Sequence, residues 1–246
     1  MNRREISIPT PDGACRAMLC VPDEGAGPWP GVILYMDAPG YRPEFWALAE
    51  GLADQGYVAL APDLFYRQGP YPPWNATQLF ADPDVRAAWL KTRMGALSPE
   101  MALRDTQAFL DFLSAREDVK PVFGVAGYCM GGALALRAAA AHPDQIKACA
   151  SYHGGNLATD DPQSAHLTAH RIKAEVLIAA ASEDPIFPEA QRQATEAALK
   201  QSGCVYAIET FAARHGFTFS DHPAYDQAAS QRQWDTMKAL FARALK

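Results

Sequence analysis

Short, nearly uninterrupted apolar runs recur along the chain, and amphipathic segments separate them. Each run has the length of one β-strand, and runs without polar alternation are typical of strands covered on both faces in a parallel sheet. Strands that alternate with helices build βαβ units, so the sequence predicts an α/β fold with a mostly parallel central sheet and helices on both faces. The runs are GVILYM (31–36), YVALAP (57–62), VFGVAG (122–127), KACASYH (147–153) and EVLIAAA (175–181).

Turn and capping signals place the other elements. A Pro-Asp-Gly turn separates the strand patterns EISI and CRAMLCV near the N-terminus. Ser98 is a candidate N-cap with Pro99 at the first helical position. The remaining expected elements are a strand over 204–211 and helices over 43–55, 100–115, 133–141, 188–201 and the last residues around 237–245.

A chain of 246 residues suits one large domain or two small ones. Residues 66–83 are rich in proline and aromatic side chains, but strand and helix patterns resume after them without a change of composition. We therefore predict a single domain over 1–246. Loops of this length often belong to functional sites, so residues 66–98 are a candidate loop or helix covering the site.

Charge and cysteine usage exclude several classes of partner. The formal net charge is −6 and no basic run occurs, which argues against nucleic acid and anionic membranes. The 5 cysteines are scattered without a C-x-x-C pair, and the N-terminus shows no secretory pattern, so a cytoplasmic location is expected. Neither histidines nor cysteines have zinc-site spacing, and we predict no metal and no cofactor.

The segment GYCMGG places Cys129 in the pattern glycine–any residue–nucleophile–any residue–glycine, between a predicted strand and a predicted helix. This pattern describes the nucleophile elbow, in which a strained turn exposes the nucleophile at the end of a sheet. A buried, inert cysteine is the alternative, because free cysteine is often buried. A cysteine that only packs in the core needs no flanking glycines, so we interpret Cys129 as the nucleophile.

A nucleophile of this type needs a histidine base and an acid that orients the base. On this elbow the acid follows the nucleophile in the chain, and the histidine comes last. Glu183 and Asp184 both follow the run EVLIAAA, and we choose Asp184, which directly precedes Pro185. His215, in the segment RHGF after the last predicted strand, is the predicted base.

An oxyanion hole completes such a site. One donor should be the backbone N–H of Met130, and the second should come from the loop DAPG, with Ala38 as the candidate. His153 ends another predicted strand at the same sheet edge. It is either a pocket residue or an ordinary strand-end histidine.

With these motifs the chain resembles the dienelactone hydrolases (carboxymethylenebutenolidases), cysteine members of the α/β-hydrolase superfamily. The resemblance covers nearly the whole chain. It implies the α/β-hydrolase fold and a triad of Cys129, Asp184 and His215. The stretches that carry it are GYCMGGALAL, QGYVALAPDLFYRQGP, EDPIFP and RHGF.

The resemblance also implies further site residues, with two departures. Asp37 matches an acid, usually glutamate in the family, that interacts with the resting thiol; a loop-capping role is the alternative. Arg86 is a candidate for one of two arginines that hold a substrate carboxylate, or else a solvated helix arginine. Phe219 stands where the second arginine is expected, and a phenyl ring cannot form a bidentate clamp. Together with Phe65, Tyr66, Tyr71 and Trp74, it suggests a more aromatic, less cationic pocket.

The sequence therefore predicts a cysteine-dependent hydrolase of a carboxylic ester or lactone that acts through a covalent thioester. Its expected partner is a small-molecule ester or lactone, and the chain is expected to be a monomer or homodimer. Two alternatives stay open at this point. One is a thioesterase or general carboxylesterase on the same triad, and the other is a non-catalytic small-molecule receptor.

Overall fold

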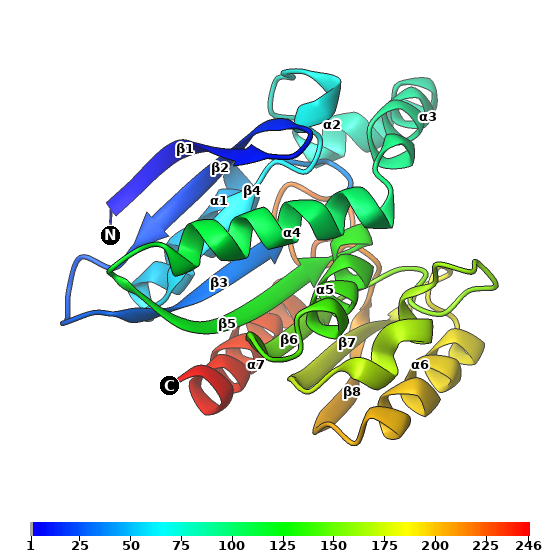
Figure 1. Ribbon diagram of the computed structural model, residues 1–246. Helices are drawn as coiled ribbons and strands as arrows, with labels where there is room; N and C mark the ends of the chain where they lie inside the picture. The colour runs from blue at the N-terminus through cyan, green and yellow to red at the C-terminus, as the bar shows by residue number, and fades with distance from the viewer. Residues whose placement is uncertain (1) are drawn as a thin grey trace.

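A sheet with helices on both faces forms the centre of the molecule (Figure 1). The computed structural model describes residues 2–246, within which eight strands lie in the order β1-β2-β4-β3-β5-β6-β7-β8. Neighbours from β4 to β8 are parallel, whereas β2 is antiparallel to both β1 and β4. The strands are β1 (Asn2–Thr10), β2 (Gly13–Val21), β3 (Trp29–Tyr35), β4 (Val58–Pro62), β5 (Val119–Tyr128), β6 (Ile146–Tyr152), β7 (Glu175–Glu183) and β8 (Tyr206–Arg214).

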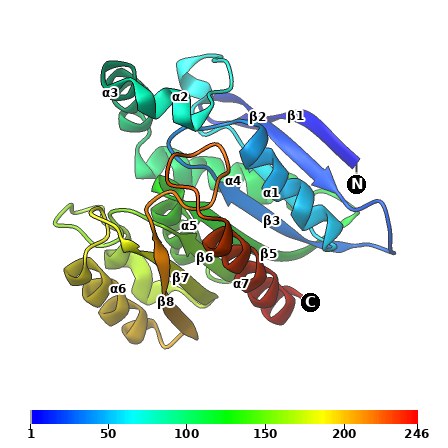
Figure 2. The ribbon, with the colours of Figure 1, turned by 180° about the vertical axis from the view of Figure 1, so that it is seen from behind.

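Different helices cover the two faces of the sheet. Helices α4 (Pro99–Ser114) and α5 (Met130–Ala141) cover the face seen in Figure 1, and α1 (Pro43–Asp54) and α7 (Gln227–Leu245) cover the opposite face (Figure 2). Helix α6 (Glu189–Ser202) packs against the 3-10 helix η3 (Ala165–Arg171), which in turn contacts α5. The predicted α/β architecture, a mostly parallel sheet with helices on both faces, is confirmed.

The apolar runs of the sequence are the inner strands of this sheet. They form β3 to β7, and every residue of β4 is buried. Strands covered on both faces have no solvent side, which is why their sequences lack polar alternation. The predicted cap of α4 is also confirmed, since the Ser98 side chain accepts the Met101 N–H at 3.2 Å.

Residues 66–98 contain more regular structure than the loop expected over 66–83. They form η1 (Tyr66–Gln68), α2 (Ala76–Ala81), α3 (Pro83–Thr92) and η2 (Met94–Ala96). Short side-chain caps explain the two α-helices. Asn75 accepts the Gln78 N–H, and Asp82 accepts the N–H groups of the first turn of α3. We call residues 66–98 the lid segment.

The topology brings the predicted site residues to one edge of the sheet. The carboxyl ends of parallel strands meet at the same edge, where α/β sheets place their ligands. Cys129 directly follows β5, Asp184 follows β7 and His215 follows β8. None of the helices in residues 2–246 is both long enough and apolar enough to cross a bilayer.

Candidate active site

Cys129 lies in a strained turn between β5 and α5. Its φ of 53° and ψ of −118° are backbone dihedral angles that residues other than glycine rarely adopt. The surrounding backbone holds this conformation. The Cys129 N–H donates to the Tyr152 carbonyl at 3.2 Å, and the Cys129 carbonyl accepts the Gly132 N–H at 3.0 Å. The strain is therefore balanced by neighbouring hydrogen bonds, and the turn presents the sulfur at the sheet edge.

The glycines around Cys129 are required by close backbone contacts. A Cβ atom on Gly127 would overlap the carbonyl of Gly131, and one on Gly131 would overlap the carbonyl of Tyr35. A Cβ on Gly132 would collide with the Ser151 hydroxyl. The elbow thus brings strand and helix closer together than any side chain would permit.

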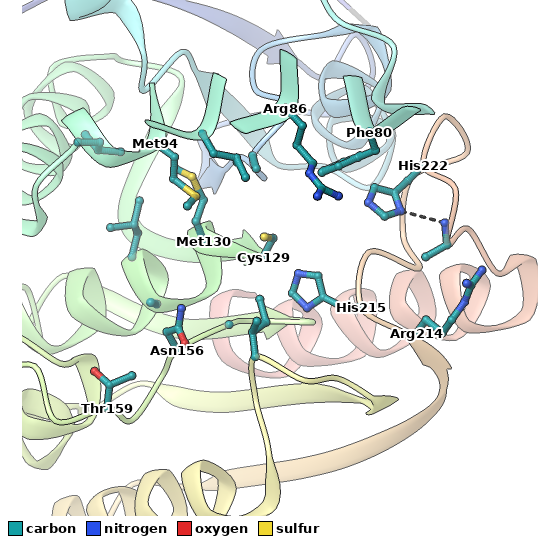
Figure 3. A pocket seen from close by; sticks show the side chains of 18 of the residues that line it. Phe80, Arg86, Met94, Cys129, Met130, Asn156, Thr159, Arg214, His215 and His222 are labelled. Atoms are coloured by element: carbon teal, nitrogen blue, oxygen red, sulfur yellow. Dashed lines mark hydrogen bonds between the residues drawn. The ribbon is translucent and has the colours of Figure 1, made fainter. Parts of the chain in front are cut away.

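The structure brings the predicted base and its predicted orienting acid together. His215 Nδ1 lies 2.9 Å from Oδ2 of Asp184, whose side chain is fully buried. The other oxygen of Asp184 accepts the Ile186 N–H at 3.1 Å, which fixes the carboxylate. His215 Nε2 has no hydrogen-bond partner among the described residues. Figure 3 shows the imidazole and the Cys129 sulfur together at the base of one cavity.

The environment of His215 favours the imidazolium form. Burial lowers its pKa, but the hydrogen bond to Asp184, together with the negative charges of a Cys129 thiolate and of the Asp184 carboxylate, outweighs burial and raises the pKa to about 10. A histidine that readily holds a proton can take one from the thiol and later give it to a leaving group. This is the electrostatic requirement for an activated thiolate.

The raised pKa predicts how stability should depend on pH. Because the folded pKa of His215 lies above its ordinary value of 6.5, its contribution is fully present below pH 6.5 and is lost as the pH rises toward 10. Asp184→Asn removes the carboxylate that holds this proton. We expect the difference in unfolding free energy between wild type and variant to be largest near pH 6 and to shrink toward pH 10. Urea unfolding at three pH values measures it, and a difference independent of pH would contradict the assignment.

The predicted oxyanion donors are the backbone N–H groups of Met130 and Ala38. Met130 begins α5, so its N–H has no acceptor within the helix. The Asp37 carbonyl accepts the Gly40 N–H at 3.0 Å. In a trans peptide the next N–H points the opposite way, so the Ala38 N–H is directed away from that turn. Both Met130 and Ala38 line the cavity with Cys129.

The cavity has a volume of about 1020 Å³ and lies between the sheet edge and the lid segment. On one side of Cys129, Met94 of the lid segment lies opposite Met130 of α5 (Figure 3), and the apolar residues Leu90 and Leu134 also line the cavity. On the other side it is aromatic and basic (Figure 3). The residues there are Phe80, Arg86, Arg214 and His222.

Arg86 reaches this cavity from the exposed surface of α3, and its guanidinium points into the space beside Phe80 (Figure 3). His222 was not singled out from the sequence. Its ring packs 4.9 Å from Phe80, and its Nδ1 accepts the Ala224 N–H at 3.0 Å. The ring also occupies the place where a Cβ of Gly216 would lie. The only sequence signal for this position is Gly216 in the segment HGF, because a glycine there leaves room for the His222 ring.

Asp37 lies in a different environment from the one expected. Both of its oxygens are bound by Arg42, at 2.5 and 3.0 Å. Arg42 also binds both oxygens of Asp221, at 2.9 and 3.2 Å, and is completely buried. Asp37 is therefore held by a guanidinium and does not line the cavity. We call Asp37, Arg42 and Asp221 the buried ion cluster.

Phe219 and the other aromatic residues also lie elsewhere than expected. Phe219 is buried with its ring 4.5 Å below the Arg42 guanidinium, and it does not line the cavity. Phe65, Tyr71 and Trp74 surround Trp89 beneath α3. The expected aromatic pocket wall is thus replaced by an aromatic cluster beneath α3, and Phe80 supplies the aromatic ring in the cavity itself.

His153 is fully buried behind His215, with the two ring centroids 5.1 Å apart. Burial, and then the neighbouring His215, hold its pKa well below the ordinary range, so the ring is neutral. It does not line the cavity. Its position suits packing against the His215 ring and not contact with a ligand.

A parallel sheet whose strand ends carry an elbow cysteine, a buried aspartate and a hydrogen-bonded histidine defines an α/β-hydrolase. The family model for the dienelactone hydrolase family matches residues 15–245. The chain belongs to the dienelactone hydrolase family, and it is a hydrolase of the carboxylic ester or lactone type.

Individual relatives agree with this assignment. A protein of Yersinia pestis named "Putative carboxymethylenebutenolidase" is 26% identical over 97% of this chain and 87% of its own length. The carboxymethylenebutenolidase of Rhodococcus opacus is 35% identical over 51% of this chain and 44% of its own.

Solved structures show the same fold. A crystal structure described as a "Putative Dienelactone Hydrolase" from Klebsiella pneumoniae has a TM-score of 0.85 at 24% identity, covering 98% of each chain. A dienelactone hydrolase-like promiscuous phosphotriesterase from metagenomic libraries has a TM-score of 0.79 at 25% identity. It covers 100% of this chain and 99% of its own.

Proposed function

We propose that the protein hydrolyses a small carboxylic ester or lactone through a thioester on Cys129. The observation that carries this proposal is the constellation of an elbow cysteine beside a histidine whose Nδ1 lies 2.9 Å from a buried aspartate. His215, oriented by Asp184, accepts the thiol proton at Nε2. That nitrogen is free of other hydrogen bonds within the described residues.

In the first half-reaction the Cys129 sulfur attacks the substrate carbonyl carbon. The N–H groups of Met130 and Ala38 then stabilise the oxyanion, and each such donor contributes about 3 kcal/mol to transition-state stabilisation. The carbon–oxygen bond to the alcohol breaks, and the imidazolium of His215 protonates the departing alkoxide. The product of this step is a thioester and a free alcohol, or the opened ring of a lactone.

In the second half-reaction His215 removes a proton from water, which attacks the thioester carbonyl. The carbon–sulfur bond breaks, the thiolate leaves and the carboxylic acid is released. The site returns to its initial charge state. Thiolate nucleophiles suit activated acyl groups such as enol esters and lactones, for which the first half-reaction has a good leaving group.

The cavity supports a substrate with a sizeable apolar part. Its volume of about 1020 Å³ exceeds what a small polar lactone fills, and Leu90, Met94 and Leu134 give one side an apolar lining. Arg86 can meet a negative group on the other side. The second cation that the resemblance would place at position 219 is replaced by a buried phenyl ring, so a substrate carboxylate is not required.

Rapid mixing with an activated aryl ester, followed by acid quenching and mass spectrometry, tests the proposal. We expect a burst of phenolate release and one acyl group on the peptide that contains Cys129, followed by steady turnover. Two results together would contradict the thioester route. They are turnover without any adduct on that peptide, and turnover that stays intact after Cys129 has been alkylated.

The same experiment separates the alternatives. A persistent acyl adduct without turnover would indicate a receptor that retains its ligand. An ester hydrolase and a thioesterase would use the same triad, so they are separated by substrate preference. The values of kcat/KM for a panel of oxygen esters, lactones and thioesters measure that preference.

A further inference from the structure

Within the lid segment, α3 packs into the core of the protein through one side chain. Trp89 is the only buried residue of that helix, all of which the structure describes. Its ring packs edge-on against Tyr71 at 5.0 Å, and against Phe65 and Trp74 at 5.9 Å. The position of α3 relative to the sheet edge therefore depends on Trp89.

Trp89 also forms a polar contact at the proposed oxyanion hole. Its indole Nε1–H donates to the Ala38 carbonyl at 2.8 Å, across 51 residues of sequence. The preceding carbonyl, that of Asp37, is held by the Gly40 N–H at 3.0 Å. The peptide groups on both sides of Ala38 are thus fixed, and these two contacts set the direction of the Ala38 N–H.

We propose that Trp89 is a positioning residue that aligns the Ala38 N–H for the oxyanion and couples the lid segment to the oxyanion hole. This inference rests on the proposed function. An oxyanion donor acts only when it is aimed at the place where the charge develops, and loss of one such donor lowers kcat by about 10²–10³-fold. Trp89 touches no reacting atom and acts through the Ala38 peptide.

The same helix face also contacts the cavity. Arg86, Trp89 and Leu90 are spaced three and four residues apart, which places them on one side of α3. Arg86 and Leu90 line the cavity, whereas Trp89 holds the Ala38 loop. A substrate that presses against Arg86 or Leu90 therefore acts on the helix that fixes the oxyanion donor.

Trp89→Phe tests the inference, because it keeps an aromatic ring in the cluster and removes the indole donor. We expect kcat for an activated aryl ester to fall by about 10–100-fold, part of the loss for a whole donor. KM should stay close to the wild-type value, since the ground-state ester has no oxyanion. The matched control is Trp74→Phe, because the Trp74 Nε1 is buried in the same cluster without a hydrogen-bond partner among the described residues. The control should keep the wild-type kcat.

Alkylation of Cys129 by iodoacetamide separates positioning from general disruption. This reaction displaces iodide at a saturated carbon and forms no oxyanion, so Trp89→Phe should be alkylated at the wild-type rate. Equal losses in alkylation and hydrolysis, or a wild-type kcat in Trp89→Phe, would overturn the inference. So would an equal loss of kcat in Trp74→Phe.

Two further variants distinguish a folding defect from loss of the hydrogen bond, and the role of Trp89 from the proposed function. If Trp89→Phe does not fold, β-(3-benzothienyl)alanine at position 89 preserves the ring shape without the N–H, and the same loss of kcat is expected. Cys129→Ala is measured beside these variants. If it hydrolyses the ester at the wild-type rate, the proposed function itself is wrong, whereas an inactive Cys129→Ala beside a fully active Trp89→Phe rejects only the role of Trp89.

Discussion

Cys129→Ala is expected to lower kcat for an activated aryl ester by on the order of 10⁴-fold or more, because loss of a covalent nucleophile removes the function of the whole triad. The cavity and the oxyanion donors stay in place, so substrate binding should change little. Steady-state hydrolysis corrected for the spontaneous reaction measures the effect. The expected loss is the largest for any single side chain in this protein.

Cys204→Ala is the matched control for this change. Cys204 is the other cysteine of the described chain that is not fully buried, and it lies outside the cavity. Its removal should leave kcat unchanged. Comparable activity in Cys129→Ala and wild type would show that the thiol is not the nucleophile, and comparable losses in both variants would point to a nonspecific effect of removing a thiol.

Arg42→Met is expected to lower the free energy of unfolding by about 3–5 kcal/mol, because it leaves the carboxylates of Asp37 and Asp221 buried without their cation. The side chains of the pair are at most 4% exposed, and that of Arg42 is 0% exposed, so water cannot replace the guanidinium. Urea unfolding at neutral pH measures the loss. Because Asp37 directly precedes Ala38, kcat should fall as well.

An exposed ion pair provides the control. Arg104 binds Asp12 with its side chain 44% exposed, so Arg104→Met should cost at most about 1 kcal/mol. Replacing the buried ion cluster as a whole, with Asp37→Asn and Asp221→Asn added to Arg42→Met, should recover part of the stability because no buried charge is then left unpaired. A loss below about 1 kcal/mol in Arg42→Met alone would contradict this account.

The sheet, and the positions of the proposed triad residues at one edge of it, could be predicted because the information is local or ordered along the chain. Apolar runs mark β3 to β7, and the glycines around Cys129 mark the elbow. Asp184 and His215 follow from the order in which strands end at one sheet edge, without knowledge of their distance. The structure adds the 2.9 Å contact between them.

The buried ion cluster and the Trp89 contact could not be predicted in this way. Arg42 joins Asp221 across 179 residues, and Trp89 joins Ala38 across 51. Neither Arg42 nor Trp89 lies in a sequence motif, and a single arginine or tryptophan does not indicate which distant residue it will contact. The same limit applies to Asp37, whose place beside the elbow was predicted but whose partner depends on a side chain that only the folded chain brings near.

The contact between Arg42 and Phe219 makes these two positions epistatic. A guanidinium introduced at position 219 would meet Arg42, which lies 4.5 Å from the present ring and already occupies all four oxygens of its two carboxylates. Like charges at such a separation in a buried site repel strongly. An evolutionary path from this chain to one with a cation at 219 would therefore have to alter Arg42 first, and that step passes through an intermediate with unpaired buried carboxylates. The phenyl ring at 219 is thus maintained by its buried neighbour, independently of any selection by the substrate.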